Sequence, residues 1–223
     1  MDGDNQIALF DRMAKELYVA VISDILDGLG HRGQVLRAEI RPVRSDSRDI
    51  LVGRAATVLF APIYEMPEAP YTVQIAAIDA LRPGDVGVFS TGGMKDATFW
   101  GELFSNAAQV RGARGMVMDG YHRDTRKILD LGFPVFSAGA RPLDIAGRAQ
   151  AIAYDVPVMC AGVLVRPGDI IFAEIDGIAV IPREIAEQTV TLAFEKVAKE
   201  DQARDDLRAG SLLGEVWAKY RVL

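Results

Sequence analysis

The sequence has few of the residues that form disulfides or bind transition metals. It contains one cysteine, Cys160, and two histidines among 223 residues. A single cysteine excludes an intrachain disulfide, and two histidines exclude a multi-histidine metal site within one chain. Any bound metal must therefore be held by carboxylates and water, which suits Mg²⁺ or Mn²⁺. Cys160 lies in the apolar stretch 156–163, where we interpret it as a small core residue.

The sequence also lacks an excess of positive charge and long apolar runs. The formal net charge is −6, and phosphate binding needs a basic face, so nucleic acid is not expected as a partner. No apolar run approaches the roughly 18 residues of a membrane span. The N-terminus, MDGDNQIALF, lacks the positive region and the apolar block of a signal peptide. We expect a cytoplasmic protein that associates with neither nucleic acid nor membranes.

What the sequence does contain is an alternation of helix and strand patterns. Half of its residues are apolar, which is enough for the core of one domain. Hydrophobic spacing predicts helices over residues 6–29, 71–81, 101–112 and 124–131, and strands over 51–60, 86–90, 115–120 and 134–139. The strand–helix–strand order over 115–139 favours a parallel pair in an α/β fold.

The rest of the chain is predicted to form further strands and then one long helix. Strand patterns cover 156–165, 170–175 and 178–182, and the tetrapeptide RPGD, which occurs twice, predicts Pro-Gly turns. From about 183 to 208 a charged helix is expected, with a narrow apolar stripe formed by Val190, Phe194 and Val197. Such a helix often packs on another subunit, so we divide the chain into a domain, 1–182, and a helical extension, 183–223.

The stretch 28-GLGHRG-33 matches the G-x-G-x-x-G pattern of dinucleotide-binding proteins. That fingerprint requires a strand before it and a helix after it, whereas here a helix precedes it and a loop follows. We therefore interpret its glycines as a helix terminus and His31 as a surface loop residue.

The stretch 119-DGYHRD-124 is a better candidate for a functional site, because it places four ionisable groups at the end of a predicted buried strand. In open α/β sheets, ligands bind at the carboxyl ends of the strands. A structural interpretation stays open: Asp124 at a helix start can cap free backbone N–H groups, and Arg123 can be a surface arginine. His122 is interpreted as a solvated turn residue.

The longer segment 101-GELFSNAAQVRGARGMVMDGYHRDTRKI-128 resembles the family that contains the 4-hydroxy-4-methyl-2-oxoglutarate/4-carboxy-4-hydroxy-2-oxoadipate aldolases and the regulator of ribonuclease activity A. The shared pattern is a Gly-acid-Leu helix start, a G-x-x-G before the central strand, and then D-G-x-x-R-D. A P-V-F strand at 134–136 and a P-G-D turn at 167–169 follow in the same order. The similarity covers about residues 15–182, and the helical extension resembles the arm of the aldolase branch.

The resemblance implies a class II aldolase, in which a divalent metal rather than a lysine Schiff base stabilises a pyruvate enolate. Asp124 would ligate Mg²⁺ or Mn²⁺ directly, Glu102 would contact the metal through a water, and Arg123 would hold the pyruvyl oxygens. The backbone N–H groups of Leu103 and Phe104 would hold the substrate carboxylate. These roles agree with the Lewis acidity of a bound metal, the planar fork of arginine and the affinity of helix starts for anions.

The resemblance also implies a contribution from a second subunit. Gly101 would line the substrate site, and an acid on the C-terminal arm of a neighbouring subunit would complete it. Glu200 is our choice for this acid, with Glu195 and Asp201 as alternatives. The implied architecture is a layered, swivelling β/β/α domain with a C-terminal helical arm, assembled as a homotrimer or a dimer of trimers.

Three functional hypotheses follow. The first is a metal-dependent lyase that cleaves 4-hydroxy-2-oxo acids to pyruvate, and the second is the same enzyme with oxaloacetate decarboxylation as its main reaction. The third is a non-catalytic protein that docks on a partner, as the ribonuclease regulator does.

A Schiff-base aldolase would need a buried, deprotonated lysine, and neither Lys95 nor Lys127 lies in an apolar strand. The loop 91–100, with Trp100, is expected to help set the size of the substrate.

Overall fold

The centre of the molecule is a mixed sheet whose middle strands run parallel. The computed structural model describes residues 3–44 and 50–222. The sheet has the strand order β1-β7-β5-β3-β2-β12-β13, and β9 also pairs with β2. Its parallel strands are β2 (Leu51–Pro62), β3 (Asp85–Ser90), β5 (Gly115–Met118) and β7 (Val135–Ser137). The parallel β5–β7 pair confirms the unit predicted over 115–139.

Antiparallel strands extend this sheet on both sides. β1 (Arg41–Pro42) pairs with β7 at one edge. On the other side, β12 (Ile170–Glu174) pairs with the start of β2, β9 (Ala149–Tyr154) pairs with the end of β2, and β13 (Gly177–Ile181) follows β12 as a hairpin. β9 was not predicted, because its stretch 149-AQAIAY-154 carries a weak strand pattern.

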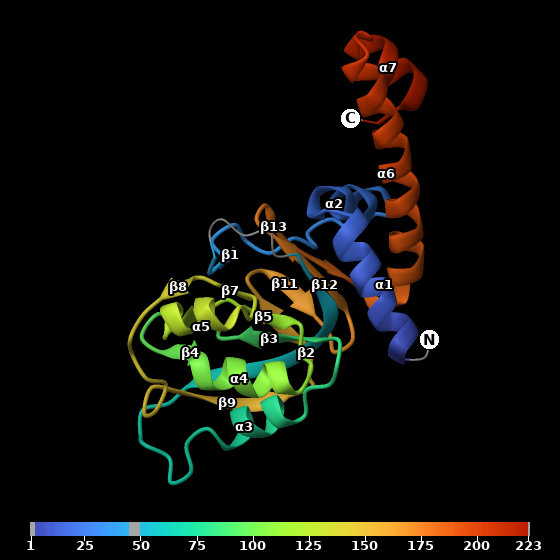
Figure 1. Cartoon of the computed structure of the whole chain (residues 1–223). Coiled ribbons are helices and arrows are strands. Elements are labelled where there is room, and N and C mark those ends of the chain that lie inside the picture. The colour runs from blue at the N-terminus through green and yellow to red at the C-terminus, as the bar shows by residue number, and fades with distance from the viewer. Residues whose placement is uncertain (1–2, 45–49, 223) are drawn as a thin grey trace.

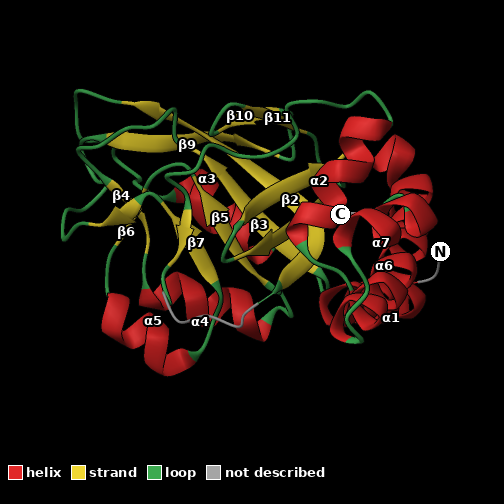
Figure 2. Ribbon diagram, turned by 90° about the horizontal axis from the view of Figure 1, so that it is seen from above, coloured by secondary structure: helices red, strands yellow, loops and turns green. Residues whose placement is uncertain are grey.

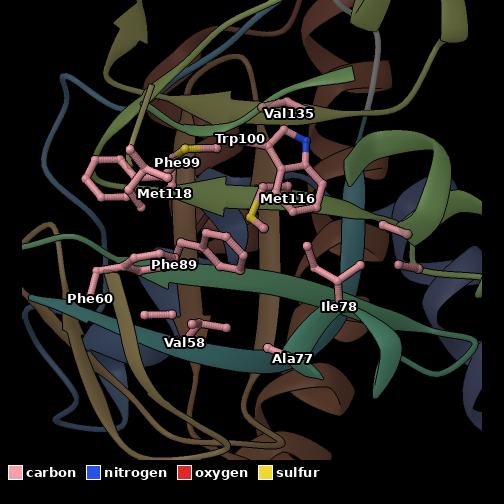
Figure 3. Close-up of a cluster of buried hydrophobic side chains, with 14 of the residues drawn as sticks. Val58, Phe60, Ala77, Ile78, Phe89, Phe99, Trp100, Met116, Met118 and Val135 are labelled. Atoms are coloured by element: carbon pink, nitrogen blue, oxygen red, sulfur yellow. The ribbon is translucent and has the colours of Figure 1, made fainter. Parts of the chain in front are cut away.

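Three helices connect the parallel strands and pack on one face of the sheet. They are α3 (Thr72–Asp79), α4 (Glu102–Val110) and α5 (Thr125–Leu131), close to the ranges predicted from hydrophobic spacing. Phe89, Met116 and Met118 of the sheet lie in the same buried cluster as Ala77 and Ile78 of α3 (Figure 3). Burial of such side chains contributes roughly 1.5–3 kcal/mol each, so this cluster fixes the helices on the sheet.

A second β layer covers the opposite face. The hairpin β10 (Val158–Cys160) and β11 (Val163–Val165) lies away from α4 and α5 (Figure 2) and shares a buried cluster with Val86, Val88 and Val117 of the sheet. The order of layers is therefore β/β/α, as expected from the resemblance.

Residues 156–165 form this hairpin instead of the single strand that was predicted. Ala161 and Gly162 have φ angles of 43° and 90°. Positive φ at both central residues is the geometry of a tight hairpin turn. The apolar character of the turn residues hid it from hydrophobic patterning. Cys160 is fully buried beside the turn, as predicted.

The prediction of a single helix over 6–29 is also wrong, because the chain forms two helices there, α1 (Gly3–Glu16) and α2 (Val19–Gly28). They are separated at Tyr18, which is extended with φ −145° and ψ 160°. The carboxylate of Glu174 accepts a hydrogen bond from the backbone N–H of Val19 at 2.8 Å. This contact satisfies a free donor at the start of α2, so the break is stabilised by a residue distant in sequence.

The C-terminal extension consists of the 3-10 turn Arg183–Ile185, the long helix α6 (Ala186–Arg208) and α7 (Leu213–Tyr220), which was not predicted. The apolar stripe of α6 packs on α1 and α2 of the same chain, where Val190 is buried. The distal part, with α7 folded against it, projects from the domain (Figure 1). Packing of that distal part on a neighbouring subunit stays a prediction.

Both RPGD stretches form turns, as predicted. Gly84 and Gly168 have φ angles of 89° and 86°, which favour glycine. In each turn the aspartate, Asp85 or Asp169, accepts a hydrogen bond from the backbone N–H three residues earlier, at 2.9 and 2.7 Å. Among residues 3–44 and 50–222, no helix has both the length and the apolar character needed to cross a bilayer.

Candidate active site

Three short parallel strands gather the predicted site residues, except Glu200, at one end of the domain. They are β4 (Thr98–Trp100), β6 (Tyr121–His122) and β8 (Gly139–Ala140), paired in the order β4-β6-β8. β6 and β8 begin just beyond the carboxyl ends of β5 and β7, and α4 and α5 begin just after β4 and β6. The backbone N–H of Arg123 donates to the carbonyl of Trp100 at 2.9 Å. This pairing brings the start of α4 beside Arg123 and Asp124.

Asp124 has an unusual backbone conformation. Its φ and ψ angles are 61° and 31°, in the left-handed region. It precedes α5, yet its side chain makes no capping hydrogen bond to that helix, so the capping interpretation is wrong. Instead its Oδ2 accepts a hydrogen bond from the backbone N–H of Glu102, at 3.2 Å. A non-glycine residue in this region costs about 1–3 kcal/mol and often marks a functional position.

Gly101 makes this arrangement sterically possible. A Cβ atom at position 101 would lie 2.7 Å from Oδ2 of Asp124 and 3.3 Å from Cγ of Arg123. The backbone of Gly101 is extended, with φ −161°, so the requirement for glycine is one of space. Gly101 therefore allows the carboxylate to approach the start of α4, and it lines the adjacent hollow.

Arg123 lies between two carboxylates. Its Nε is 3.9 Å from Oδ2 of Asp124, and its Nη1 is 3.5 Å from Oδ1 of Asp144. The side chain is 41% exposed, and its guanidinium donates no hydrogen bond to any residue within the described ranges 3–44 and 50–222. The group is thus held by charge while its planar set of N–H donors stays available for oxygen atoms of a ligand.

Asp144 was missed by the sequence analysis. Its carboxylate accepts hydrogen bonds from the hydroxyl of Tyr71 at 2.9 Å and from the backbone N–H of Ile145 at 2.7 Å. Burial alone would raise the pKa of Asp144, but these hydrogen bonds and the charge of Arg123 hold this pKa below its ordinary value. Asp144 therefore stays ionised at neutral pH.

The start of α4 contributes the other predicted groups. Glu102 is the first residue of the helix, and its carboxylate accepts a hydrogen bond from Asn106 at 2.7 Å and lies 4.0 Å from Nζ of Lys127. The N–H groups of Leu103 and Phe104 have no acceptor in the part of the chain that the structure describes. Unpaired N–H groups at a helix start, together with the helix dipole, favour an anion.

Arg123 and Asp124 line two adjacent hollows. One, of about 250 Å³, is mostly apolar and is lined by Tyr71, Trp100 and Phe104 among others. The second, of about 460 Å³, is more open and includes Arg141. A larger hollow of about 630 Å³ lies near the amino end of β3 and contains none of the predicted site residues. We place the candidate site at the two smaller hollows, because the unpaired polar groups converge there.

Trp100, at the end of the loop that is expected to help set substrate size, is mainly a core residue, and that role of the loop stays a prediction. It is 2% exposed, and its indole N–H donates to the hydroxyl of Ser105 at 2.8 Å. Its ring stacks on that of Phe133 with centroids 6.1 Å apart. Trp100 therefore forms a fixed wall of the smaller hollow.

His122 is buried, so the prediction of a solvated residue is wrong. It is 3% exposed, and its ring nitrogens lie 2.8 Å from the hydroxyl of Ser137 and 2.9 Å from that of Thr125. Burial lowers the pKa of His122, which favours the neutral ring. Asp119 is structural too, because it accepts a hydrogen bond from the N–H of Thr91 at 2.6 Å.

Glu200 is not brought to the site within its own chain. It lies on α6, remote from α4 and α5 (Figure 1), where it accepts a hydrogen bond from Tyr18 and lies 3.8 Å from Nζ of Lys196. Burial and this hydrogen bond raise the pKa of Tyr18. Of the alternatives, Asp201 pairs with Arg204, and Glu195 is exposed. A role for any of the three acids in a neighbouring subunit stays a prediction.

The donor set suits only a loosely held, hydrated cation. No three His, Cys, Asp or Glu side chains converge as metal ligands among residues 3–44 and 50–222. Asp124 offers one carboxylate at the rim of the hollows, with Glu102 next to it. Mg²⁺ keeps several of its waters and binds through one or two carboxylates, so these residues fit such an ion. They do not fit a zinc site, which needs four closed positions or three protein ligands.

The chain resembles known proteins over most of its length. The model of the RraA-like family, described as Aldolase/RraA, matches residues 19–180. A protein of Halalkalibacterium halodurans named "Putative 4-hydroxy-4-methyl-2-oxoglutarate aldolase" is 34% identical over 82% of this chain and 81% of its own length. Protein DlpA of Legionella pneumophila is 29% identical over 90% of this chain, which spans only 32% of the length of DlpA.

Solved structures share the fold, including the long C-terminal helix. An uncharacterized protein from Pseudomonas syringae pv. tomato gives a TM-score of 0.80 with 28% identity, covering 94% of this chain and 96% of that one. Streptomyces coelicolor RraAS2, described as an unusual member of the RNase ES inhibitor RraA protein family, gives a TM-score of 0.80 with 28% identity over 92% and 98% of the two chains.

Proposed function

The chain belongs to the RraA-like family, Aldolase/RraA, and on this premise we propose that it is a divalent-metal-dependent lyase that cleaves 4-hydroxy-2-oxo acids to pyruvate. The family contains proteins named as aldolases and proteins named as RNase inhibitors. One observation carries the proposal of catalysis. Asp124 is held in a left-handed conformation with its carboxylate directed at the start of α4 instead of capping α5.

The proposed reaction breaks the bond between C3 and C4 of the substrate. The proton of the 4-hydroxyl leaves, a carbonyl forms at C4, the bonding electrons pass to the pyruvyl fragment, and a proton added at C3 gives pyruvate. A divalent cation at Asp124 would supply Lewis-acid stabilisation of the negative charge on that fragment.

The residues of the chain would bind and orient the substrate. The N–H groups of Leu103 and Phe104 would donate hydrogen bonds to its carboxylate at the helix start. Arg123 would donate hydrogen bonds to the oxygen atoms that gain charge, since its guanidinium is not occupied by other acceptors. Glu102, with an acid from the arm of a neighbouring subunit such as Glu200, would hold the water that takes the hydroxyl proton. This step requires an oligomer, which we propose to be a trimer or a dimer of trimers.

The same site would decarboxylate oxaloacetate, because loss of CO₂ also leaves electrons on a pyruvyl fragment. The test is pyruvate release, coupled to NADH oxidation by lactate dehydrogenase. Substrates are 4-hydroxy-4-methyl-2-oxoglutarate and oxaloacetate, each with Mg²⁺, with Mn²⁺ and with chelator, for the wild type and Asp124→Asn. Pyruvate that requires metal and is lost in the variant supports the proposal. Equal pyruvate release from the wild type and Asp124→Asn would contradict it.

A second candidate function is inhibition of a ribonuclease through docking. The similarity to the Streptomyces coelicolor protein, which extends over nearly all of both chains, favours it. A docking protein needs neither metal nor the carboxylate of Asp124. Binding to an RNase of the E/ES type that is unchanged in Asp124→Asn, together with absent pyruvate release, would make this the better explanation.

A further inference from the structure

Arg123 must be oriented before a substrate arrives, because a flexible arginine would lose much of its binding energy in becoming ordered. No hydrogen bond from its guanidinium to the described residues holds it. Its two nearest charged neighbours are Asp124, at 3.9 Å, and Asp144, at 3.5 Å. In the proposed reaction the carboxylate of Asp124 is needed at the metal, so Asp144 is the neighbour that can hold Arg123 throughout.

Asp144 is itself fixed from its other side. One carboxylate oxygen accepts the N–H of Ile145 at 2.7 Å, and the second accepts the hydroxyl of Tyr71 at 2.9 Å. Both contacts lie at the edge of the same hollow of about 250 Å³ that Arg123 lines. A carboxylate with two such donors has little freedom to turn toward Arg123 and form a tight ion pair. The 3.5 Å separation, which is long for a charge-assisted hydrogen bond, is therefore maintained by its partners.

Tyr71 is held in place by its backbone. It precedes α3 with φ 71° and ψ −3°, a left-handed conformation that is uncommon for a bulky residue. Such a conformation persists only where the surrounding structure determines it. The ring packs against the buried cluster beneath α3 and α4. The hydroxyl of Tyr71 thus reaches Asp144 from a rigid position.

We propose that Asp144 and Tyr71 are positioning residues that set the orientation of Arg123 for the substrate oxygens. The hydroxyl of Tyr71 fixes the carboxylate of Asp144. That carboxylate attracts the Nη1 end of the Arg123 guanidinium by charge, without accepting a hydrogen bond from it. This inference rests on the proposed function, because it assigns Arg123 to the oxygen atoms of a 2-oxo acid.

The test uses Asp144→Asn and Tyr71→Phe, each in the wild type and in an Arg123→Ala background. The readouts are kcat and KM for pyruvate release and, by calorimetry in Mg²⁺, the Kd of oxalate, an unreactive planar dianion shaped like the pyruvyl fragment. We expect kcat/KM to fall and the oxalate Kd to rise by about five- to tenfold in each single variant. In the Arg123→Ala background either change should have less than about a twofold effect.

Matched controls separate positioning from loss of folding. Tyr64→Phe removes a hydroxyl from a side chain that is 92% exposed in the same loop. Asp79→Asn breaks an exposed pair with Arg111, at 2.9 Å, away from the site. Neither control should change KM or the oxalate Kd. Thermal unfolding of every variant shows whether the native state is retained.

The outcomes distinguish this inference from the proposed function. Normal pyruvate release and oxalate binding in both variants would overturn the positioning roles alone. If Asp144→Asn and Tyr71→Phe have equally large effects in the Arg123→Ala background, the positioning roles would also be overturned, because the two substitutions would then act through general stability. Oxalate binding that depends on Asp144, without pyruvate release from any substrate, would support the positioning roles and reject the lyase. A wild type that neither binds oxalate nor releases pyruvate would reject both.

Discussion

Replacing Asp124 by alanine, glycine and asparagine separates the backbone strain at this residue from its chemistry. All three variants lack the carboxylate charge, so we expect all three to lose metal-dependent pyruvate release. Their stabilities should differ, because the φ of 61° suits glycine and is tolerated by asparagine but not by alanine.

The expected difference follows from the geometry. Alanine in the left-handed region is disfavoured by about 1–2 kcal/mol. Glycine avoids this cost, but it destabilises the folded state by about 0.4–1 kcal/mol relative to alanine, because the unfolded chain has more conformations with glycine. Both variants lack the hydrogen bond to Glu102, so its loss cancels in the comparison. Asp124→Gly should therefore be more stable than Asp124→Ala by about 1 kcal/mol, or roughly 2–4 °C in Tm for a chain of this size.

The assay is thermal and urea unfolding of the three variants, with pyruvate release measured on the same preparations. Asp155 provides a matched control, since it also has a left-handed φ, 55°, and lies outside the candidate site. Asp155→Gly and Asp155→Ala should show the same stability difference and retain activity. The reasoning is refuted if Asp124→Ala is as stable as Asp124→Gly, or if Asp124→Gly retains metal-dependent activity.

Three further predictions address the groups around Asp124. Gly101→Ala should lower kcat/KM by about 10- to 100-fold, because its Cβ would displace the Asp124 carboxylate; Gly28→Ala, whose Cβ meets no atom within 4 Å, is the control. The lowered pKa of Asp144 means that its contribution to stability is complete above about pH 4 and is lost as the pH falls through the folded pKa. The difference in Tm between the wild type and Asp144→Asn should thus be constant from pH 6 to 8 and shrink below about pH 4. His122→Ala should lower the free energy of unfolding by about 2–3 kcal/mol in urea titrations, because the buried hydroxyl of Ser137 and the partly buried hydroxyl of Thr125 lose their partner.

Periodic elements of the fold were predictable because each is encoded by neighbouring residues. The parallel strands and α3, α4 and α5 follow from apolar spacing, and both RPGD turns follow from Pro-Gly chemistry. The break at Tyr18 was not predictable, because it depends on Glu174, which lies on a strand far along the chain. The hairpin at Ala161 was hidden for a different reason, since its turn is built from apolar residues.

The candidate site likewise contains residues that could be predicted from the sequence and one that could not. Arg123 and Asp124 were found because they lie in one short polar stretch after a predicted buried strand, whereas Glu102 was assigned through the family resemblance. Asp144 carries no local signal, since a single aspartate in a polar loop is ordinary. Asp144 can be recognised as part of the candidate site only from the fold, which places its carboxylate 3.5 Å from Arg123 and 2.9 Å from the hydroxyl of Tyr71.

The charged residues alone do not specify this site. The carboxylate of Asp124 reaches the start of α4 because position 101 has no Cβ and because the chain turns through a left-handed residue at 124. A sequence with the same arginine and aspartate but a larger residue at 101 would have to move the carboxylate. The Gly101 and Asp124 variants therefore test one idea from two sides: the backbone places the carboxylate, and its charge performs the chemistry.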